Sequence, residues 1–300
     1  MQNSNRRLQP GDIVEVRESG EIFSQLDDNG TLEGLPFMPE MLRYCGRKFK
    51  VLKSFDKIFV ENVGTRRIKS TVILEGVLCD GKAHAGCQRL CHVLWKETWL
   101  KRIEKTSMRQ VVTSYLDSRR SFFDRPLPCQ SASLVKATTR APVSFENLVR
   151  IYVCDPRFRR WVPFRQLCTL LVRFVHRTRK LFGKKRHDVL TGSCKKTPEI
   201  SLNLQPGELV EVKCKEEIET TLDPMGKNRG LAFTPEMMKY CGGRFRVQNR
   251  ITRLIDERTG KMQSTAHTVM LQHVTCDGSG HAHCPRNCFL LWREIWLKRI

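Results

Sequence analysis

The chain has 300 residues, of which 40% are hydrophobic and 28% are charged, and its formal net charge is +22. This composition excludes a fibrous protein and a wholly disordered one, and the length suits two ordinary domains. No stretch approaches the roughly 20 consecutive apolar residues of a membrane-spanning helix, and residues 1–16 contain no apolar segment of a secretory signal. We therefore expect a cytoplasmic protein, in which thirteen cysteines indicate metal binding or reactive thiols instead of a disulfide framework.

Two parts of the chain are similar to each other. Residues 9–51 match residues 205–247 at 22 of 43 positions, and residues 79–103 match residues 276–300 at 16 of 25 positions. Only two copies are present, whereas a solenoid needs at least three short repeats. The sequence therefore predicts two duplicated domains, residues 9–104 and 205–300.

The predicted elements of each domain follow the same order. In the first domain, residues 12–16 alternate as a half-buried strand does, and residues 22–26 have helical spacing. A short helix is expected to begin at Pro39 and to end at Cys45, before strands at 49–52 and 71–78. The corresponding segments of the second domain are 218–222, Pro235 to Cys241, 245–248 and 268–275.

Each domain is then expected to end in a helix. Pro285 directly follows Cys284, which suits Cys284 as the N-cap and Pro285 as the first helical residue. In the first domain, Trp95 and Trp99 lie four residues apart, as on one face of a helix. The opening Pro-Gly-Asp-x-Val-Glu-Val and the short strands resemble small SH3-like barrels. We therefore predict an α+β fold of two β-rich, SH3-like domains, each closed by a C-terminal helix and a metal site.

The segment between the two domains, residues 105–204, matches neither of them. It holds 21 Lys or Arg against 6 Asp or Glu, so most of the net charge lies there. Apolar residues between 167 and 175 predict an amphipathic helix near 164–183, and the rest of this basic connector is expected to be partly disordered. Through residues 150–187 the connector could contact nucleic acid or an anionic membrane surface, although a helix packed across the two domains explains the pattern equally well. The candidate anion-binding residues are Arg157, Arg159, Arg160, Arg173, Arg177, Arg179, Lys180, Lys184, Lys185 and Arg186.

The motif with the most chemical meaning is Cys-x4-His-x2-Cys-x3-Cys, which occurs once in each domain with the same spacing. Three thiolates and an imidazole match a closed, four-coordinate structural zinc site. The predicted ligands are Cys79, His84, Cys87 and Cys91 in the first domain, and Cys276, His281, Cys284 and Cys288 in the second. The sequence therefore predicts two zinc ions per chain.

Two alternatives to this assignment remain open. The string Cys-Asp-Gly-x-x-His resembles the end of the motif in CDGSH iron–sulfur proteins, which implies an iron–sulfur cluster instead of zinc. In this chain the histidine is one residue further away, and two cysteines follow it. Cys45 and Cys241 also occupy matching positions, where they could be additional ligands or reactive thiols of a redox protein.

A longer pattern links these motifs. Pro-Glu-Met-x-x-Tyr-Cys-Gly, then Cys-Asp-Gly-x-x-His-x-x-Cys-x-x-x-Cys, and finally Trp-x-Glu-x-Trp-Leu-Lys occur in both domains. Together they resemble a family of short, uncharacterised bacterial proteins encoded in biosynthetic gene neighbourhoods. The resemblance implies no established activity.

We therefore expect a binding or accessory protein, with an unknown protein as its partner and with a role in a bacterial biosynthetic pathway. A closed Cys3His site leaves no coordination position open for a substrate, which argues against catalysis by the metal. The alternatives are a nucleic-acid-binding protein that acts through its connector and an iron–sulfur or thiol redox protein.

Overall fold

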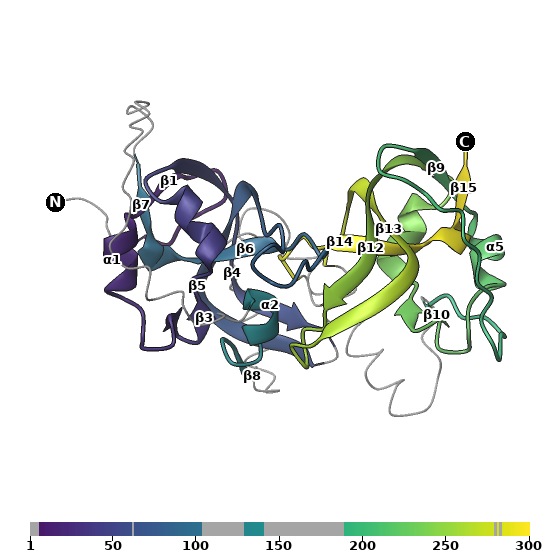
Figure 1. Cartoon of the computed structure of the whole chain (residues 1–300), viewed down its shortest axis with the longest axis horizontal. Coiled ribbons are helices and arrows are strands. Elements are labelled where there is room, and N and C mark those ends of the chain that lie inside the picture. The colour runs from purple at the N-terminus through teal and green to yellow at the C-terminus, as the bar shows by residue number, and fades with distance from the viewer. Residues whose placement is uncertain (1–5, 62, 104–128, 141–188, 279–280, 282–283) are drawn as a thin grey trace, which may run out of the picture.

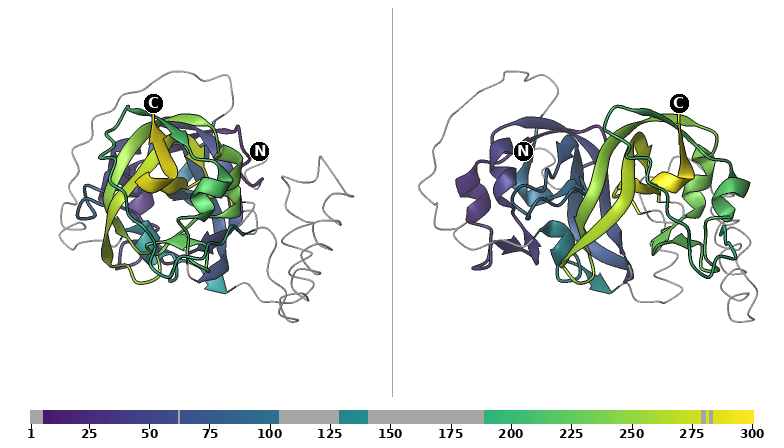
Figure 2. Two further views of the ribbon diagram at one scale, coloured as in Figure 1. Left: turned by 90° about the vertical axis from the view of Figure 1, so that its right-hand side faces the viewer. Right: turned by 45° about the vertical axis from the view of Figure 1, so that its right-hand side comes forward.

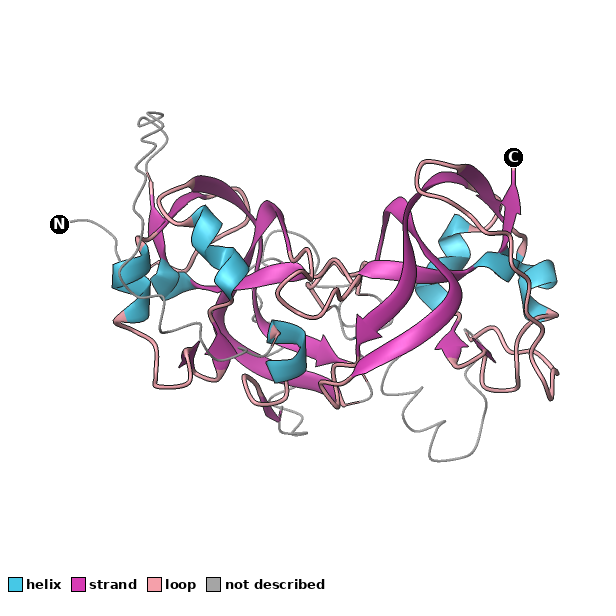
Figure 3. Ribbon diagram, in the orientation of Figure 1, coloured by secondary structure: helices cyan, strands magenta, loops and turns pink. Residues whose placement is uncertain are grey.

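A computed structural model describes residues 6–61, 63–103, 129–140, 189–278, 281 and 284–300. These residues form two lobes that lie side by side along the long axis of the molecule (Figures 1 and 2). The first lobe comprises the described residues up to 140, and the second lobe those from 189 onward. The structure is β-rich with few short helices, in agreement with the predicted α+β class (Figure 3).

Antiparallel strands of the first lobe follow the order β6-β5-β4-β1-β7. The strands of this sheet are β1 (Ile13–Val16), β4 (Lys48–Val60), β5 (Gly64–Leu78), β6 (His92–Lys96) and β7 (Leu100–Arg102). Its other elements are α1 (Ser19–Phe23), the hairpin strands β2 (Thr31–Leu32) and β3 (Leu35–Pro36), and the 3-10 helices η1 (Pro39–Tyr44) and η2 (Glu97–Trp99).

The strand order of the second lobe, β14-β13-β12-β9-β15, follows the same path through the chain. The strands of this sheet are β9 (Leu209–Val212), β12 (Arg244–Ile255), β13 (Met262–Thr275), β14 (Phe289–Arg293) and β15 (Leu297–Arg299). Its other elements are α5 (Lys215–Glu219), β10 (Lys227–Asn228), β11 (Leu231–Ala232), η5 (Pro235–Tyr240) and η7 (Glu294–Trp296).

The predicted strands are present, but the central hairpins are longer than expected. In the first lobe β4 and β5 have 13 and 15 residues, against expected strands at 49–52 and 71–78. Two register shifts interrupt their pairing, after Val51 and after Phe55. A bulge breaks the alternation of buried and exposed side chains, so the sequence pattern loses its period of two where the strand continues.

The predicted C-terminal helix is wrong in both lobes. In the first lobe this segment is β6, the short turn η2 and β7. Trp95 pairs with Val72 of β5, and Leu100 pairs with Val16 of β1. Trp95 and Trp99 are both fully buried because the 3-10 turn rotates the chain between two strands, so their spacing of four only imitates a helical face.

Aromatic side chains fill the core of each lobe. The ring of Phe37 lies edge-on to Trp99 and Trp95, with centroid separations of 5.4 and 6.3 Å. In the second lobe Phe233 lies in the same way against Trp296 and Trp292, at 5.3 and 6.1 Å. These contacts place the tryptophans in the core, where such T-shaped pairs add stability beyond the burial of area.

Two described parts of the connector pack onto the lobes. Residues 129–140 form α2 (Gln130–Ser133) and β8 (Thr139–Arg140), which pairs with β5. The buried Gln130 amide accepts a hydrogen bond from Leu94 N at 2.8 Å and donates to the carbonyls of Leu94 and Pro36 at 2.9 and 3.0 Å. Leu190 and Leu204 belong to the core of the second lobe. Among the described helices, none is long and apolar enough to cross a membrane.

The carboxylate of Glu294 supports the entry of the connector into the second lobe. Its side chain is 0% exposed and accepts hydrogen bonds from the three backbone N–H groups of residues 202–204, at 2.7, 3.1 and 3.1 Å. The equivalent Glu97 is 17% exposed and accepts only one long bond of this kind, 3.5 Å from Leu8 N.

We expect Glu294→Ala to reduce the free energy of unfolding by about 3 kcal/mol, because it leaves buried donors without a partner. Glu97→Ala is expected to cost about 1 kcal/mol. Urea unfolding monitored by tryptophan fluorescence measures both values, and equal losses in the two variants would contradict this account.

Candidate metal centres

Glu40, Cys79 and His84 bring one ligand atom each to a common point in the first lobe, within 4.8 Å of one another. Glu40 is near the start of η1, Cys79 directly follows β5, and His84 lies in the loop that leads to β6. The Glu40 Oε1 atom is 2.8 Å from His84 Nε2 and accepts a hydrogen bond from the Cys79 thiol at 3.3 Å. Carboxylate, thiolate and imidazole are all zinc ligands, so this group could hold a metal ion.

Glu236, Cys276 and His281 form the equivalent group in the second lobe, also within 4.8 Å of one another. The Cys276 thiol donates to Glu236 Oε2 at 3.2 Å, and His281 Nε2 is 3.4 Å from Glu236 Oε1. The carboxylate is 1% exposed, but the imidazole of His281 is 30% exposed, against 3% for His84. The second group is therefore open to solvent on the histidine side.

The backbone of the motif loop fixes these positions. Cys79 N donates to Cys91 O at 2.8 Å, and Cys276 N donates to Cys288 O at the same distance, so both ends of each loop are held together. Gly81 has a φ of +69°, and a Cβ atom there would lie 1.8 Å from Cys87 O. Only glycine fits this turn, which explains the Cys-Asp-Gly sequence in physical terms.

Burial and local charge set the protonation of the first group. Burial is the main cause that raises the pKa of the Cys79 thiol, and the neighbouring Glu40, Cys91 and Cys129 raise it further. Burial also acts to raise the pKa of Glu40, but the hydrogen bond and the charge of His84 outweigh it and lower the pKa. Without a metal, Cys79 is therefore a neutral thiol at pH 7, and a bound ion would displace its proton.

The sequence-predicted ligands do not come together as two groups of four, and Cys91 and Cys288 lie outside both metal groups. Cys79 and His84 come together, as do Cys276 and His281, but Cys87 and Cys284 face the opposite lobe. The Cys87 sulfur accepts a hydrogen bond from Ile255 N at 3.4 Å, and the Cys284 sulfur accepts one from Phe59 N at 3.2 Å. Phe59 and Ile255 are equivalent positions at the ends of β4 and β12, so the two contacts are related by an approximate twofold relation.

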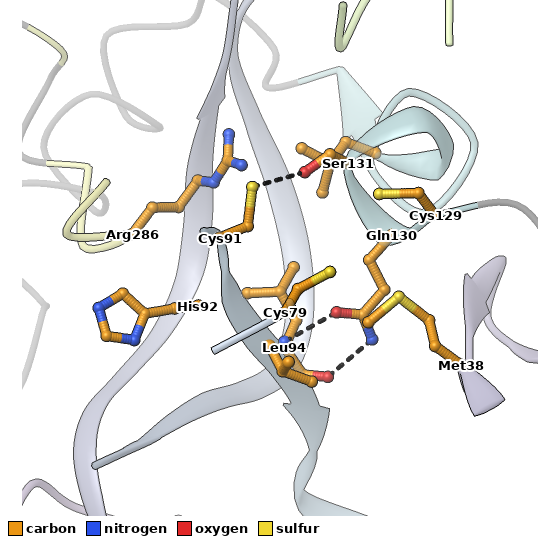
Figure 4. Close-up of a pocket in the computed structure, with 11 residues that line it drawn as sticks. Met38, Cys79, Cys91, His92, Leu94, Cys129, Gln130, Ser131 and Arg286 are labelled. Carbon is orange, nitrogen blue, oxygen red and sulfur yellow. Dashed lines mark hydrogen bonds between the residues drawn. The ribbon is translucent and has the colours of Figure 1, made fainter. Parts of the chain in front are cut away.

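Cys91 lines a small cavity beside the first group, together with Cys79 and Cys129 (Figure 4). Its thiol lies 3.3 Å from the Ser131 hydroxyl. The enclosed space has about the volume of a single water molecule. Burial raises the pKa of Cys91, although the charges of Arg89 and Arg286 act in the opposite direction.

A buried charge cluster joins the two lobes next to these thiols. The Glu257 carboxylate is 1% exposed and contacts Arg286 at 2.7 Å and Arg89 at 3.4 Å. Arg89 also reaches Ile255 O, and Arg286 reaches the equivalent Phe59 O, at 3.2 and 3.4 Å. The loops that carry the metal motifs therefore also form the contact between the lobes (Figure 3).

The remaining candidate residues lie apart from these groups. Cys45 and Cys241 follow η1 and η5 and are partly buried against the two cores. The basic residues between Arg157 and Arg186, and the helix expected near 164–183, lie outside the described residues.

Sequence reasoning missed Glu40 and Glu236 as members of the metal groups. The available signal was the Pro-Glu-Met string, which is identical in both domains. Comparison of the chain with family models, with curated proteins and with solved structures gives no match.

Proposed function

We propose that the chain is a tandem metal-binding protein in which one zinc ion per lobe holds η1 or η5 to the loop after the long hairpin. The observation that carries this proposal is that the same Glu, Cys and His side chains converge at equivalent places in both lobes. The mixed oxygen, sulfur and nitrogen donors suit zinc, whereas iron–sulfur clusters are held mainly by thiolates.

A structural role for the metal fits the surroundings of the first group. Glu40 and His84 have side-chain exposures of 6% and 3%, and the adjoining cavity has about the volume of a single water molecule. A catalytic metal keeps a coordination position that a substrate can reach. We therefore infer a non-catalytic binding or accessory protein, whose partner contacts other parts of its surface.

We further infer that each sheet closes into an SH3-like barrel and that the two lobes arose by duplication. The support is the strand order that the two lobes share. A 3-10 turn joins β6 to β7 in the first lobe and β14 to β15 in the second, and β7 and β15 pair with β1 and β9. The half-identical sequences of the two domains support the duplication.

Elemental analysis of the full chain tests the metal proposal. We expect two zinc ions per chain in the unmodified protein, one in Cys79→Ser, and none in Cys79→Ser/Cys276→Ser. Cys214→Ser is the matched control, because Cys214 is exposed and hydrogen-bonds to Glu217 instead of joining a metal group. A protein purified without chelator that contains no metal would refute the proposal. Iron together with visible absorbance would indicate an iron–sulfur cluster instead of zinc.

A further inference from the structure

Three cysteines from separate parts of the first lobe line one cavity. Cys79 follows β5, Cys91 precedes β6, and Cys129 comes from the connector, directly before α2. Figure 4 shows the Cys79, Cys91 and Cys129 side chains gathered around this space, with the Met38 thioether beside them. Among the described residues of this lobe, only the ligand atoms of Glu40, Cys79 and His84 all lie within 4.8 Å of one another, so a bound ion would draw the Cys91 and Cys129 thiols inward across the cavity.

The position of Cys129 is fixed by its neighbours. The next residue, Gln130, makes three hydrogen bonds with Leu94 and Pro36, and Leu134 is fully buried in the core. Cys129 itself is only 7% exposed. A thiol held in this way is already ordered in the folded chain, so little conformational entropy is lost when it binds an ion.

Buried positive charge next to the cavity favours an anionic occupant. The Arg286 side chain reaches the cavity from the second lobe and is 8% exposed, and Arg89 is 16% exposed. Glu257 is the buried carboxylate between the two guanidinium groups, and Glu61, which is 53% exposed, pairs with Arg89 from the solvent side. Metal-bound thiolates in the cavity would lie next to the buried Arg286 side chain, whose charge favours them.

The second lobe differs from the first at this place. Cys129 has no equivalent in the repeat, and the connector segment that enters the second lobe places Cys194 elsewhere, with its thiol donating to Thr220 O at 3.0 Å. In the described part of the second lobe, the groups near Cys276 are Glu236, His281 and Cys288.

We propose that Cys129 is a ligand of the metal ion in the first lobe, where it joins Cys79, Cys91 and His84, and that this ion anchors residues 129–140 of the connector. The inference rests on the proposed function and makes the two sites unequal. The first site has three thiolates beside the His84 and Glu40 donors, and binds thiophilic d10 ions such as Zn²⁺ or Cd²⁺ more tightly. The second site has two thiolates, from Cys276 and Cys288, and takes its remaining ligands from His281 and Glu236.

Cobalt substitution of the full chain tests this inequality. Cys276→Ser leaves only the first site intact, and Cys79→Ser leaves only the second. Because thiolate-to-cobalt charge transfer grows with the number of coordinated thiolates, we expect the band of Cys276→Ser to be about 1.5-fold stronger than that of Cys79→Ser. Bands of equal intensity would overturn the inference, and this comparison requires no substitution of Cys129.

A second comparison addresses Cys129 directly. In the Cys276→Ser background, adding Cys129→Ser should reduce the band by about a third and weaken cobalt binding by about 10- to 100-fold. Adding Cys194→Ser, at the other connector cysteine, should change neither. In the same experiment, cobalt should slow tryptic cleavage after Lys136 only while Cys129 is present. An unchanged band and affinity in the Cys129→Ser variant would overturn the inference. If neither single-site protein binds cobalt, the proposed function itself fails.

Discussion

Removal of zinc from the full chain is expected to lower its thermal unfolding midpoint by roughly 10 °C for each site that is emptied. An ion present at 1,000 times its dissociation constant stabilises the folded state by about 4 kcal/mol, if the unfolded chain does not bind it. In the first lobe the ion would join Glu40 of η1 to Cys79 and His84, which lie 39 and 44 residues away in sequence. Without it, the polar contacts between η1 and the loop are those of Glu40 with Cys79 and His84 and the partly exposed ion pair of Arg43 with Asp80.

Differential scanning calorimetry with and without a chelator measures this effect. Cys79→Ser and Cys276→Ser should each show about half of the chelator-dependent shift, and the double variant should show none. Cys214→Ser should behave like the unmodified protein, because its exposed thiol belongs to neither metal group. A midpoint that is independent of chelator in the unmodified protein would contradict a structural role for the metal.

The second large effect is expected at the contact between the lobes. Glu257→Ala should reduce the free energy of unfolding by about 3–5 kcal/mol, because it leaves the buried guanidinium groups of Arg89 and Arg286 without their shared carboxylate. It also removes the acceptor for Glu61 N, which donates to Glu257 Oε2 at 3.1 Å. Urea unfolding gives the energy, and small-angle X-ray scattering shows whether the lobes separate.

The repeat itself provides the control. Glu61 is the equivalent residue in the first lobe and pairs with Arg89 at 2.8 Å, but its side chain is 53% exposed. Exposed ion pairs contribute little, so Glu61→Ala should cost less than about 1 kcal/mol. Equal losses at Glu61 and Glu257 would show that burial does not determine how much each carboxylate contributes to the free energy of unfolding.

The same cluster predicts a dependence on pH. Burial acts to raise the pKa of Glu257, but the charges of Arg286 and Arg89 outweigh it and lower the pKa below its ordinary value of 4.5. The stabilisation is therefore present above pH 4.5 and is lost as the pH falls through the lowered pKa. Glu257→Gln should remove this part of the acid sensitivity, which acid titration of the unmodified chain and the variant measures.

The positions of the main strands could be predicted. The alternating segment 12–16 overlaps β1 from Ile13 on, and the segments 49–52 and 71–78 lie within β4 and β5. The last segment could not be assigned in the same way, because the spacing of Trp95 and Trp99 fits both a helix and two strands around a 3-10 turn. Pairing with β1 and β5 decides between them, and this pairing joins residues far apart in sequence.

The candidate site was predicted in part. Duplication within the chain identified Cys79 and His84 and their equivalents, because each occurs at a matching position in both copies. It also repeats the Pro-Glu-Met string, but nothing local links Glu40 to Cys79, which lies 39 residues further along the chain on another element. It also could not show that the thiols of Cys87 and Cys284 face the opposite lobe.

The sequence by itself determined the composition of each metal motif, the two similar halves and the concentration of charge in the connector. These are properties of residue type and spacing, which are local. Only the tertiary structure decided which donors meet, because a ligand set is defined by distances of a few ångströms between elements far apart in the chain. For that reason Glu40 joins Cys79 and His84 in the first group, while Cys87 takes part in the contact with the second lobe.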